Sequence, residues 1–225
     1  MNRARGAMAS SGQLSYQLLK SAADPSFEQF FRIYAESIHA REQKPKELIA
    51  KMVARPDYKI FLQKLDGDVT GFSIVFAPPG EEFCLLEYMA VDSSRRNTGL
   101  GGRLFLHTTQ AMGAPGGAPL PMLLEVDSDR EPSPDQQLRK RRLEFYKRLG
   151  CLRVDALSYI LPLAGTGAVP EMFLLMHAPV EVHSIPKSQL RHLLAVIYEK
   201  VYSCPPNDPR IARMLEGVSD PAGLK

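Results

Sequence analysis

What the sequence lacks argues against several protein classes. Its three cysteines are odd in number and widely spaced, and no CxxC motif or Cys/His cluster accompanies them. This argues against a disulfide framework and against a zinc site. No apolar run reaches the roughly 18 residues of a membrane span, and the opening MNRARGAMASSGQ lacks the hydrophobic stretch of a secretory signal. We therefore expect a cytoplasmic protein with reduced thiols, no metal and no membrane association.

The sequence also lacks a strong excess of one charge. Its 28 basic and 25 acidic side chains give a net charge of +3 and are largely interspersed. Charge therefore does not indicate nucleic-acid binding. There is no internal repeat and no low-complexity tract. What is present is an ordinary globular composition of 225 residues, 44% of them hydrophobic, which is enough for one sizeable core and an accessory element.

Hydrophobic spacing divides the chain into three parts. We expect a flexible leader at residues 1–13, a main domain at 14–180 and a helical extension at 181–225. In the extension, SQLRHLLAVIYEKVYS (188–203) has the apolar stripe of an amphipathic helix. Three roles remain open for this extension: closing a substrate pocket, supporting a homodimer or capping a sheet edge.

The main domain alternates strand and helix patterns. Its first half predicts a strand, two helices and an antiparallel hairpin, at 14–20, 25–38, 45–55, 58–65 and 69–77. Its second half predicts a strand, a helix, a strand, a helix and two strands, at 83–91, 100–112, 122–126, 136–149, 151–163 and 172–180. The hairpin turns at the tripeptide DGD. The run FCLLEYMAV is almost continuously apolar, which is typical of a central strand covered on both faces.

The stretch LLEYMAVDSSRRNTGLGGRLF (85–105) leads from this strand through a basic, glycine-bearing loop into a helix. Backbone N–H groups at a helix start have no partner within the helix, and the helix dipole favours negative charge there. Glycine lets the main chain approach an anion, and Arg95, Arg96 and Arg103 add positive charge. The stretch therefore predicts a phosphate-binding loop. Its spacing matches neither GxxxxGK[ST] nor GxGxxG, since Leu104 stands at the third glycine position.

The loop does match R-x-x-G-x-G, from Arg96 to Gly101, immediately after a strand that ends in MAV. Together with FYKRLGC (145–151), this pattern resembles the GNAT superfamily of acetyl-coenzyme A-dependent N-acyltransferases. The resemblance covers about residues 14–180, and the predicted order of elements is also the family's order. It implies an α/β (α+β) fold, in which a GNAT-like mixed, mostly antiparallel central sheet is flanked by helices.

The resemblance implies acetyl-coenzyme A (acetyl-CoA) as the cosubstrate. Its diphosphate would lie on the N–H groups of the glycine loop. Its pantetheine arm would pair like an extra strand with the end of the apolar strand, where that strand and 122–126 part. The residues implied are Met89, Ala90, Val91, Arg96, Asn97, Thr98, Gly99, Leu100, Gly101 and Gly102. The alternative is a tight loop that only joins a strand to a helix, with solvated arginines.

Acetyl transfer to an amine needs a base, an oxyanion donor and an acid. An alkylamine with a pKa of about 10.4 is mostly protonated near neutrality, so a base must remove its proton. Glu87 is the first candidate, because strand alternation puts it on the face of Met89 and many family members carry the base on this strand. Burial would raise its pKa. Glu87 could instead be paired with an arginine. Glu125 in LEV is the second candidate, since some related enzymes carry their base there.

The resemblance also implies that the Met89 N–H is the oxyanion donor and that Tyr146 in EFYKRLG returns a proton to the thiolate. A phenol can do so if transfer is concerted with bond breaking or if its pKa is tuned. Tyr146 could instead only pack against the pantetheine arm. One position departs from the family, because Arg139 stands where many relatives have an asparagine that holds the coenzyme. The run RKRR (139–142) either grips a coenzyme phosphate or coats a solvated helix face.

The predicted function is an N-acetyltransferase that moves an acetyl group from acetyl-CoA to a small primary amine by direct attack. Acidic residues at the end of the strand 122–126 and in the loop after it would attract a cationic acceptor: Glu125, Asp127, Asp129, Glu131 and Asp135. A fold does not choose among polyamine, aminoglycoside and lysine acceptors. Two alternatives stay open, a catalytically silent acyl-CoA-binding regulatory or interaction module, and a nucleotide enzyme with a phosphate loop.

Overall fold

The computed structural model describes residues 12–113, 118–162 and 171–225. Nearly all of the expected leader lies outside these residues, as does part of the connection at 113–121. Along the chain the elements are β1 (Leu14–Leu19), α1 (Ser26–Ser37), α2 (Lys46–Val53), β2 (Tyr58–Leu65), β3 (Asp68–Phe76), β4 (Cys84–Val91), the 3-10 turn η1 (Ser93–Arg95), α3 (Leu100–Ala111), β5 (Met122–Asp127), α4 (Gln136–Arg148), β6 (Leu152–Arg153), β7 (Met172–His177), β8 (Ser184–Ile185), α5 (Lys187–Lys200), α6 (Pro209–Leu215) and β9 (Ala222–Gly223).

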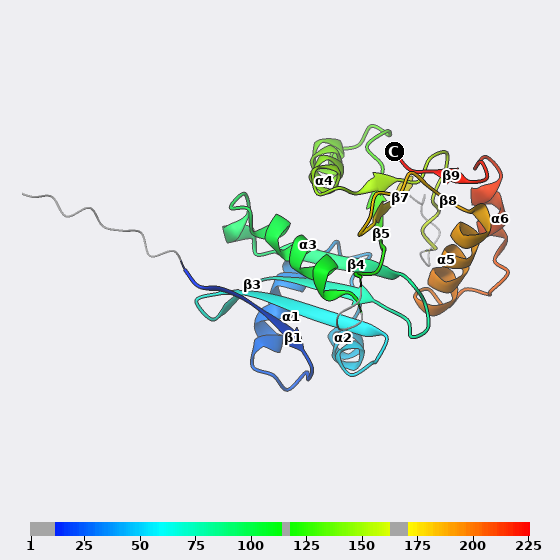
Figure 1. The fold of residues 1–225 in the computed structure, drawn as a ribbon. Coiled ribbons are helices and arrows are strands. Elements are labelled where there is room, and N and C mark those ends of the chain that lie inside the picture. Colours follow the sequence, from blue (N-terminus) through cyan, green and yellow to red (C-terminus); the bar gives the residue numbers. More distant parts are fainter. Residues whose placement is uncertain (1–11, 114–117, 163–170) are drawn as a thin grey trace, which may run out of the picture.

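A seven-stranded sheet forms the centre of the molecule, in the order β1-β2-β3-β4-β5-β7-β6. Neighbouring strands are antiparallel except β4 and β5, which run parallel. Helices α1 and α2 lie on one face of the β1–β4 half and α3 lies on the other (Figure 1). Helix α4 and the pair α5 and α6 lie on opposite sides of the remaining strands (Figure 1). This confirms the predicted mixed, mostly antiparallel sheet flanked by helices.

Each face of the sheet has its own hydrophobic core, because successive side chains of a strand point to opposite faces. In β4, Leu85 is buried on the side of α1, α2 and α5, whereas Cys84 and Leu86 are buried on the side of α3 and α4. From α1, Phe27 and Phe30 enter the first core, as the helical stripe predicts. Burying one such side chain stabilises the fold by about 2 kcal/mol.

The hairpin of β2 and β3 turns at Asp66, with a φ of 53°, and Gly67, with a φ of 94°. Two consecutive positive φ angles in a two-residue loop match the right-handed twist of the flanking strands, and the sequence Asp-Gly favours this geometry. The predicted hairpin is confirmed.

The strand predicted at 151–163 is much shorter than expected. β6 covers Leu152–Arg153, and within the described residues that follow, the sheet contacts are isolated bridges at Val154 and Tyr159. The chain turns at Ala156, whose φ of 54° lies in the left-handed region and cannot continue a strand. The Asp155 side chain accepts a hydrogen bond from the Ala156 N–H at 2.8 Å, which supports the turn. Hydrophobic content alone did not reveal it.

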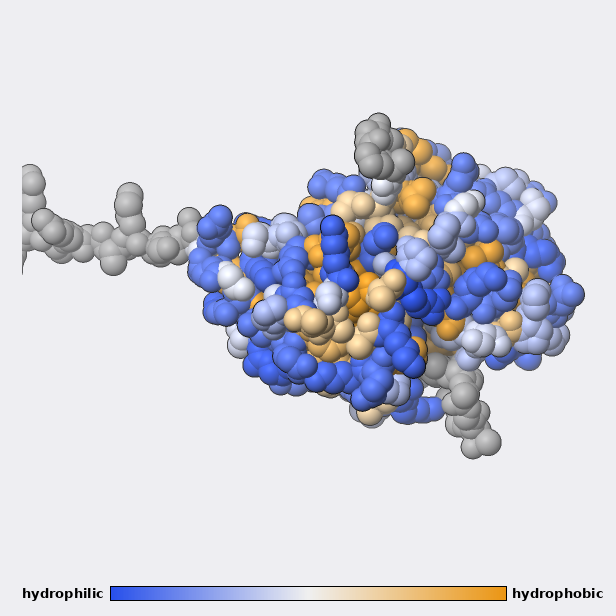
Figure 2. Space-filling view, turned by 90° about the horizontal axis from the view of Figure 1, so that it is seen from below, coloured by the Kyte–Doolittle hydropathy of each residue, from blue (hydrophilic) through white to orange (hydrophobic). Residues whose placement is uncertain are grey.

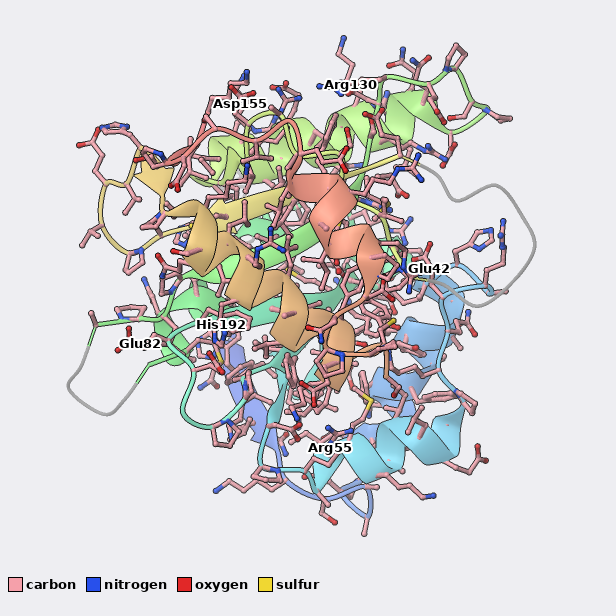
Figure 3. All side chains as sticks on the ribbon, turned by 90° about the vertical axis from the view of Figure 1, so that its right-hand side faces the viewer. Glu42, Arg55, Glu82, Arg130, Asp155 and His192 are labelled. Atoms are coloured by element: carbon pink, nitrogen blue, oxygen red, sulfur yellow. The ribbon has the colours of Figure 1, made fainter. Side chains whose placement is uncertain are left out.

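The C-terminal segment packs against the main sheet. Helices α5 and α6 lie across the side of the molecule that faces the viewer in Figure 3. Leu190, Leu194 and Ile197 of α5 are fully buried and belong to the same core as α1 and α2. β8 and β9 form a separate two-stranded sheet beside them. The predicted extension is thus present and helical, and its apolar stripe faces the chain's own core.

The face of the molecule seen from below is mostly hydrophilic (Figure 2). On the face seen from below, hydrophilic residues surround a smaller hydrophobic area (Figure 2). Across the parts of the chain that the structure describes, no helix has both the length and the apolar character that crossing a membrane would require.

Candidate active site

Strands β4 and β5 part in the middle of the sheet. Their parallel pairing joins Cys84–Leu86 to Met122–Leu124. Beyond these residues β4 continues beside β3 and β5 continues beside β7. The residue that follows the last parallel pair is a glutamate in both strands. Glu87 and Glu125 therefore stand at the opening of the sheet, as the sequence places them.

A β-bulge in β4 lies at the same point. Val75 of β3 faces Leu86, but the next residue back, Ile74, faces Tyr88. Glu87 is the extra residue that has no partner position on β3. A bulge bends the strand and increases its twist, so it contributes to the divergence of β4 from β5.

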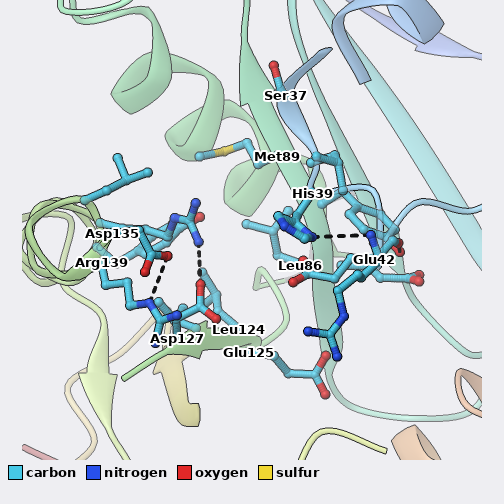
Figure 4. A pocket seen from close by; sticks show the side chains of 18 of the residues that line it. Ser37, His39, Glu42, Leu86, Met89, Leu124, Glu125, Asp127, Asp135 and Arg139 are labelled. Atoms are coloured by element: carbon cyan, nitrogen blue, oxygen red, sulfur yellow. Dashed lines mark hydrogen bonds and ion pairs between the residues drawn. The ribbon is translucent and has the colours of Figure 1, made fainter. Parts of the chain in front are cut away.

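A pocket of about 490 Å³ lies at this opening. Its walls come from the end of α1 and the α1–α2 connection, from β4 and β5, and from α4 (Figure 4). The lining residues are Glu36, Ser37, Ile38, His39, Arg41, Glu42, Leu86, Glu87, Tyr88, Met89, Leu124, Glu125, Val126, Asp127, Asp135, Leu138, Arg139, Arg142 and Tyr146. The pocket thus brings together four residues for which the sequence suggests roles in catalysis: Glu87, Met89, Glu125 and Tyr146.

Glu87 forms an ion pair with Lys44, whose ammonium group also donates a hydrogen bond to the Tyr88 hydroxyl at 3.2 Å. Only 4% of the Glu87 side chain and 21% of the Lys44 side chain are exposed. The second carboxylate oxygen of Glu87 is buried without a hydrogen-bond partner among the described residues. Lys44 contacts both Glu87 and Tyr88, so these two neighbouring side chains lie on the same side of β4. Simple alternation would instead put Glu87 on the same face as Met89, and the bulge explains the difference. The partner is a lysine, where the sequence suggested an arginine.

Glu125 accepts hydrogen bonds from two tyrosine hydroxyls. Tyr159 donates to Oε1 and Tyr202 donates to Oε2. Burial raises the pKa of Glu125, the hydrogen bonds from Tyr159 and Tyr202 lower it, and the Glu87 carboxylate and the Lys44 ammonium group make smaller, opposite contributions. With all of these effects together, the pKa is raised to about 7. Glu125 therefore titrates near neutral pH, which suits a general base.

Tyr146, in the last turns of α4, is 9% exposed and lines the pocket. Its ring meets those of Phe105 and Phe145 edge-on, with centroid distances of 5.6 and 5.1 Å. Burial raises the pKa of Tyr146 to about 12, so the phenol keeps its proton at neutral pH. This state is compatible with both roles predicted for it, a proton donor and a packing residue.

The glycine loop joins β4 to α3 through two residues with left-handed backbone, Asn97 with a φ of 63° and Gly99 with a φ of 81°. Glycine adopts this conformation without strain, and asparagine tolerates it better than most residues. The side-chain amide of buried Gln63 donates to the Leu100 carbonyl at 3.0 Å and so fixes the first turn of α3. A rigid helix start with free N–H groups fits an anion.

The residues expected to meet the pantetheine arm also fit an extended guest. Met89, Ala90 and Val91 are partly exposed and pair with β3 on one side, whereas the side towards β5 has no strand partner in the described sheet. A Cβ atom on Gly101 would lie 3.6 Å from the Phe145 ring, so the start of α3 packs closely on α4. The strand end and the helix start are therefore the residues that could hold a coenzyme.

Acidic residues at the end of β5 and just before α4 form ion pairs with arginines of α4. Arg142 pairs with Asp127 at 2.9 Å, and Arg139 pairs with Asp135 at 3.0 Å (Figure 4). Two arginines of the RKRR run therefore bind the chain's own carboxylates in this state. The other two acidic residues expected at the rim do not line the described pocket: Asp129 and Glu131. Glutamates of α1 and the α1–α2 connection add to the negative charge instead: Glu36 and Glu42.

Three residues that hold the two glutamates were not predicted. Lys44, Tyr159 and Tyr202 lie 43, 34 and 77 positions along the chain from their partners. None belongs to a local motif, because Lys44 lies in a connection, Tyr159 lies in a segment expected to be a strand, and Tyr202 follows the last turn of α5. Only the tertiary contacts reveal them.

A sheet parted between two parallel strands, with a glycine-bearing helix start beside the gap, is the arrangement that the resemblance to the GNAT acetyltransferases implies. A model of the acetyltransferase (GNAT) family matches residues 25–151, more than half of the chain. The chain therefore belongs to the GNAT family of N-acetyltransferases.

Solved structures share the fold. A Bacteroides thetaiotaomicron protein assigned to the GNAT acetyltransferases is 20% identical, with a TM-score of 0.69 over 85% of this chain and 99% of that one. An aminoglycoside 6'-N-acetyltransferase complexed with coenzyme A is 18% identical, with a TM-score of 0.54 over 76% and 98%. A spermidine N-acetyltransferase chimera from Vibrio cholerae and hSSAT is 11% identical, with a TM-score of 0.54 over 74% and 96%. Comparison with curated proteins gives no match.

Proposed function

We propose that this protein transfers the acetyl group of acetyl-CoA to a primary amine of a small, cationic molecule by direct attack of the amine. The observation that carries the proposal is the position of Glu125, a carboxyl with a pKa near 7 at the point where β4 and β5 part. When bound, acetyl-CoA supplies a thioester that is activated for attack. The chain's own residues hold the partners and move the protons.

The coenzyme would be held by the glycine loop and by the end of β4. The N–H groups from Asn97 to Gly102, which lead into the start of α3, would bind the diphosphate, and Arg96 would add positive charge beside them. The free edge of Met89–Val91 would take the pantetheine arm as an extra strand. One structural neighbour is an aminoglycoside 6'-N-acetyltransferase complexed with coenzyme A, which supports this assignment.

Glu125 is the better candidate for the base. It would take a proton from the acceptor's ammonium group, which leaves a neutral amine able to attack. Its pKa near 7 keeps a large share of the carboxyl ionised at neutral pH while leaving it basic enough to accept a proton. Glu87, the first candidate from sequence, is already bound to Lys44. We therefore assign Glu87 to binding positive charge in the pocket, and Glu125 to proton removal.

Tyr146 would return a proton to the departing thiolate. Its phenol is protonated at neutral pH because burial raises its pKa to about 12. So weak an acid must transfer the proton in concert with breaking of the carbon–sulfur bond. The Met89 N–H, which the family resemblance implies as the oxyanion donor, lies between Glu87 and the glycine loop along β4.

The acceptor would enter beside the α1–α2 connection. Six carboxyl-bearing residues line the pocket: Glu36, Glu42, Glu87, Glu125, Asp127 and Asp135. Three of them are paired, Asp127 and Asp135 with arginines and Glu87 with Lys44, so among the described residues Glu36, Glu42 and Glu125 supply the unshared negative charge. A cationic amine would be attracted by this charge. Two structural neighbours are named as an aminoglycoside and a spermidine N-acetyltransferase, and aminoglycosides and spermidine are cationic amines of this kind.

The test is a thiol-release assay with acetyl-CoA across a panel of polyamines, aminoglycosides and amino acids. We expect release with at least one cationic amine. Glu125→Gln should lower kcat by about 100-fold or more, the usual share of a general base, whereas Glu87→Gln should act mainly through the KM of the amine. Tyr146→Phe should lower kcat without weakening coenzyme binding.

The opposite result would support a silent acyl-CoA-binding module. In that case calorimetry would detect coenzyme binding, but no amine would be acetylated and none of the three substitutions would change thiol release. Stabilisation by ATP or GTP beyond that by coenzyme A would support the nucleotide enzyme.

A further inference from the structure

We propose that Tyr202 and Tyr159 are positioning residues for Glu125, so that the C-terminal segment, which lies outside the matched family region, completes the active site. The family match ends at residue 151, before either tyrosine. The inference rests on the proposed function, because it assigns to these hydroxyls the orientation and the protonation state of the base. It also gives α5 a role in the reaction beyond covering the core.

The geometry occupies both oxygens of one carboxylate. Tyr159 donates to Oε1 of Glu125, and Tyr202 donates to Oε2. A carboxylate held at both oxygens cannot rotate freely, so its remaining lone pairs keep one direction relative to the pocket. Hydroxyl donors stabilise the ionised form more than the protonated form. The two tyrosines therefore counteract the burial that favours a neutral carboxyl.

The position of Tyr202 is determined by the end of α5. The Val201 N–H donates to the Ile197 carbonyl at 2.9 Å, and the Cys204 N–H donates to the Tyr198 carbonyl at 2.9 Å across a left-handed Ser203 with a φ of 56°. This closed turn fixes the direction in which the next side chain leaves the helix.

Tyr198 anchors the same helix end without touching Glu125. Its hydroxyl donates to the Ile160 carbonyl, in the segment that carries Tyr159. The ring of Tyr198 meets those of Tyr159 and Tyr202 edge-on, with centroid distances of 6.4 Å each. The three rings form one packed unit, of which only the outer two hydroxyls reach the carboxylate.

Other groups around Glu125 are few, and their effects oppose one another. Glu87 of β4 raises the pKa of Glu125, and Lys44 of the α1–α2 connection lowers it. The hydroxyls of Tyr88 and Tyr198 stay protonated, because burial raises the pKa of each above its usual value of 10. Replacing Tyr159 or Tyr202 by phenylalanine leaves the side chains of Lys44 and Glu87 present. A change in the titration of Glu125 in such variants is therefore attributable to the lost hydrogen bond.

The experiment compares Tyr202→Phe and Tyr159→Phe with the wild-type protein over pH 5.5 to 9.5, using kcat/KM for an active amine. Loss of one donor should raise the pKa of Glu125, so the acidic limb of the profile should move to higher pH by about one unit. At pH 7 the ionised fraction would fall from about one half to about one tenth, a loss of roughly fivefold. Near pH 9 the difference should shrink, because the carboxyl is ionised in both proteins.

Tyr198→Phe is the matched control. It removes a hydroxyl from the same ring cluster and a hydrogen bond from the same helix end, but no donor to Glu125. We expect its acidic limb to stay at the wild-type position even if its thermal stability falls. If Tyr202→Phe and Tyr198→Phe lower activity equally at every pH, the tyrosines are structural and the proposal is overturned.

A second measurement does not need activity. The Glu125 carboxyl can be titrated by 13C NMR on glutamate-labelled protein, with Glu125→Gln for assignment, and its midpoint should rise in Tyr202→Phe but not in Tyr198→Phe. Equal midpoints in all proteins would contradict the inference. If the midpoint rises although no amine is acetylated, the hydrogen bonds are as described and it is the proposed function that has failed.

Discussion

At the scale of single residues, the ion pair of Lys44 and Glu87 is the most consequential contact that lies outside any motif. Both side chains are largely withdrawn from water, and one oxygen of Glu87 has no partner among the described residues. Removing one member of a buried pair leaves the other charge unsolvated, which costs more than the pair contributes. The pair therefore constrains both the α1–α2 connection and the bulge in β4.

We predict that Lys44→Met lowers the free energy of unfolding by about 3 kcal/mol, because it leaves the Glu87 carboxylate buried and unpaired. The double variant Lys44→Met/Glu87→Gln should recover part of this loss. Urea denaturation measures both values.

Lys46→Met is the control for this prediction. Lys46 pairs with Glu28 at 2.7 Å, but 41% of its side chain and 71% of the Glu28 side chain are exposed. Lys46→Met removes this ion pair and a contact with the Phe31 ring, and it should lower the free energy of unfolding by about 1 kcal/mol at most. Equal losses for the two lysine variants would show that the Lys44 pair is solvated.

At the scale of elements, the glycine loop combines a left-handed backbone with the start of a helix. Gly99 stands at the N-terminal end of α3 with a φ of 81°, and a Cβ there would meet nothing within 4 Å. Replacement would therefore strain the backbone without a steric clash. Gly80, in the connection between β3 and β4, has a φ of 86° and equally open surroundings. The two glycines therefore have similar backbone conformations and surroundings, but only Gly99 lies in the glycine loop.

We predict that Gly99→Ala and Gly80→Ala each lower the free energy of unfolding by about 1 to 2 kcal/mol, the cost of a left-handed residue with a Cβ. Only Gly99→Ala should weaken coenzyme A binding, by about tenfold or more, because a shifted helix start loses an N–H bond to a charged group. Calorimetry with coenzyme A distinguishes them. Equal affinity in both variants would place the diphosphate elsewhere.

At the scale of the whole molecule, the C-terminal segment and the sheet share one core. Leu194 and Ile197 of α5 are fully buried among residues of α1, α2 and the sheet. Further contacts join the segment to the rest of the chain, among them the hydrogen bond from Tyr202 to Glu125 and the pairing of Val154 with Leu224. The extension at 181–225 should therefore unfold together with the main domain.

We predict that Leu194→Ala lowers the free energy of unfolding by about 3 kcal/mol in a single cooperative transition. Leu106→Ala, at a side chain that is 43% exposed, should change it by about 0.5 kcal/mol or less. Truncation after residue 180 should abolish cooperative unfolding, which differential scanning calorimetry would show. Two separate transitions in the full chain would instead indicate an independent C-terminal domain.

Features that depend on neighbours in sequence were predictable. The Asp66-Gly67 turn follows from the φ angles that these residues tolerate, and the stripe of Phe27 and Phe30 follows from helical periodicity. The short β6 was not predictable, because the left-handed Ala156 is stabilised by a local side-chain bond that hydrophobic content does not record. The prediction that Glu87 lies on the same strand face as Met89 was wrong for a similar reason. A bulge shifts the alternation of side chains on which that prediction relied.

The sequence by itself determined the class of fold, the place of the glycine loop and the identity of two glutamates beside a parted sheet, because each rests on a short pattern of residue types. Only the tertiary structure decided which residues contact each of the two glutamates. Lys44 reaches Glu87, and Tyr159 and Tyr202 reach Glu125, from segments that are distant in sequence. Proton affinity depends on burial and on such neighbours, so the preference for Glu125 as the base could not be formed before the chain was folded.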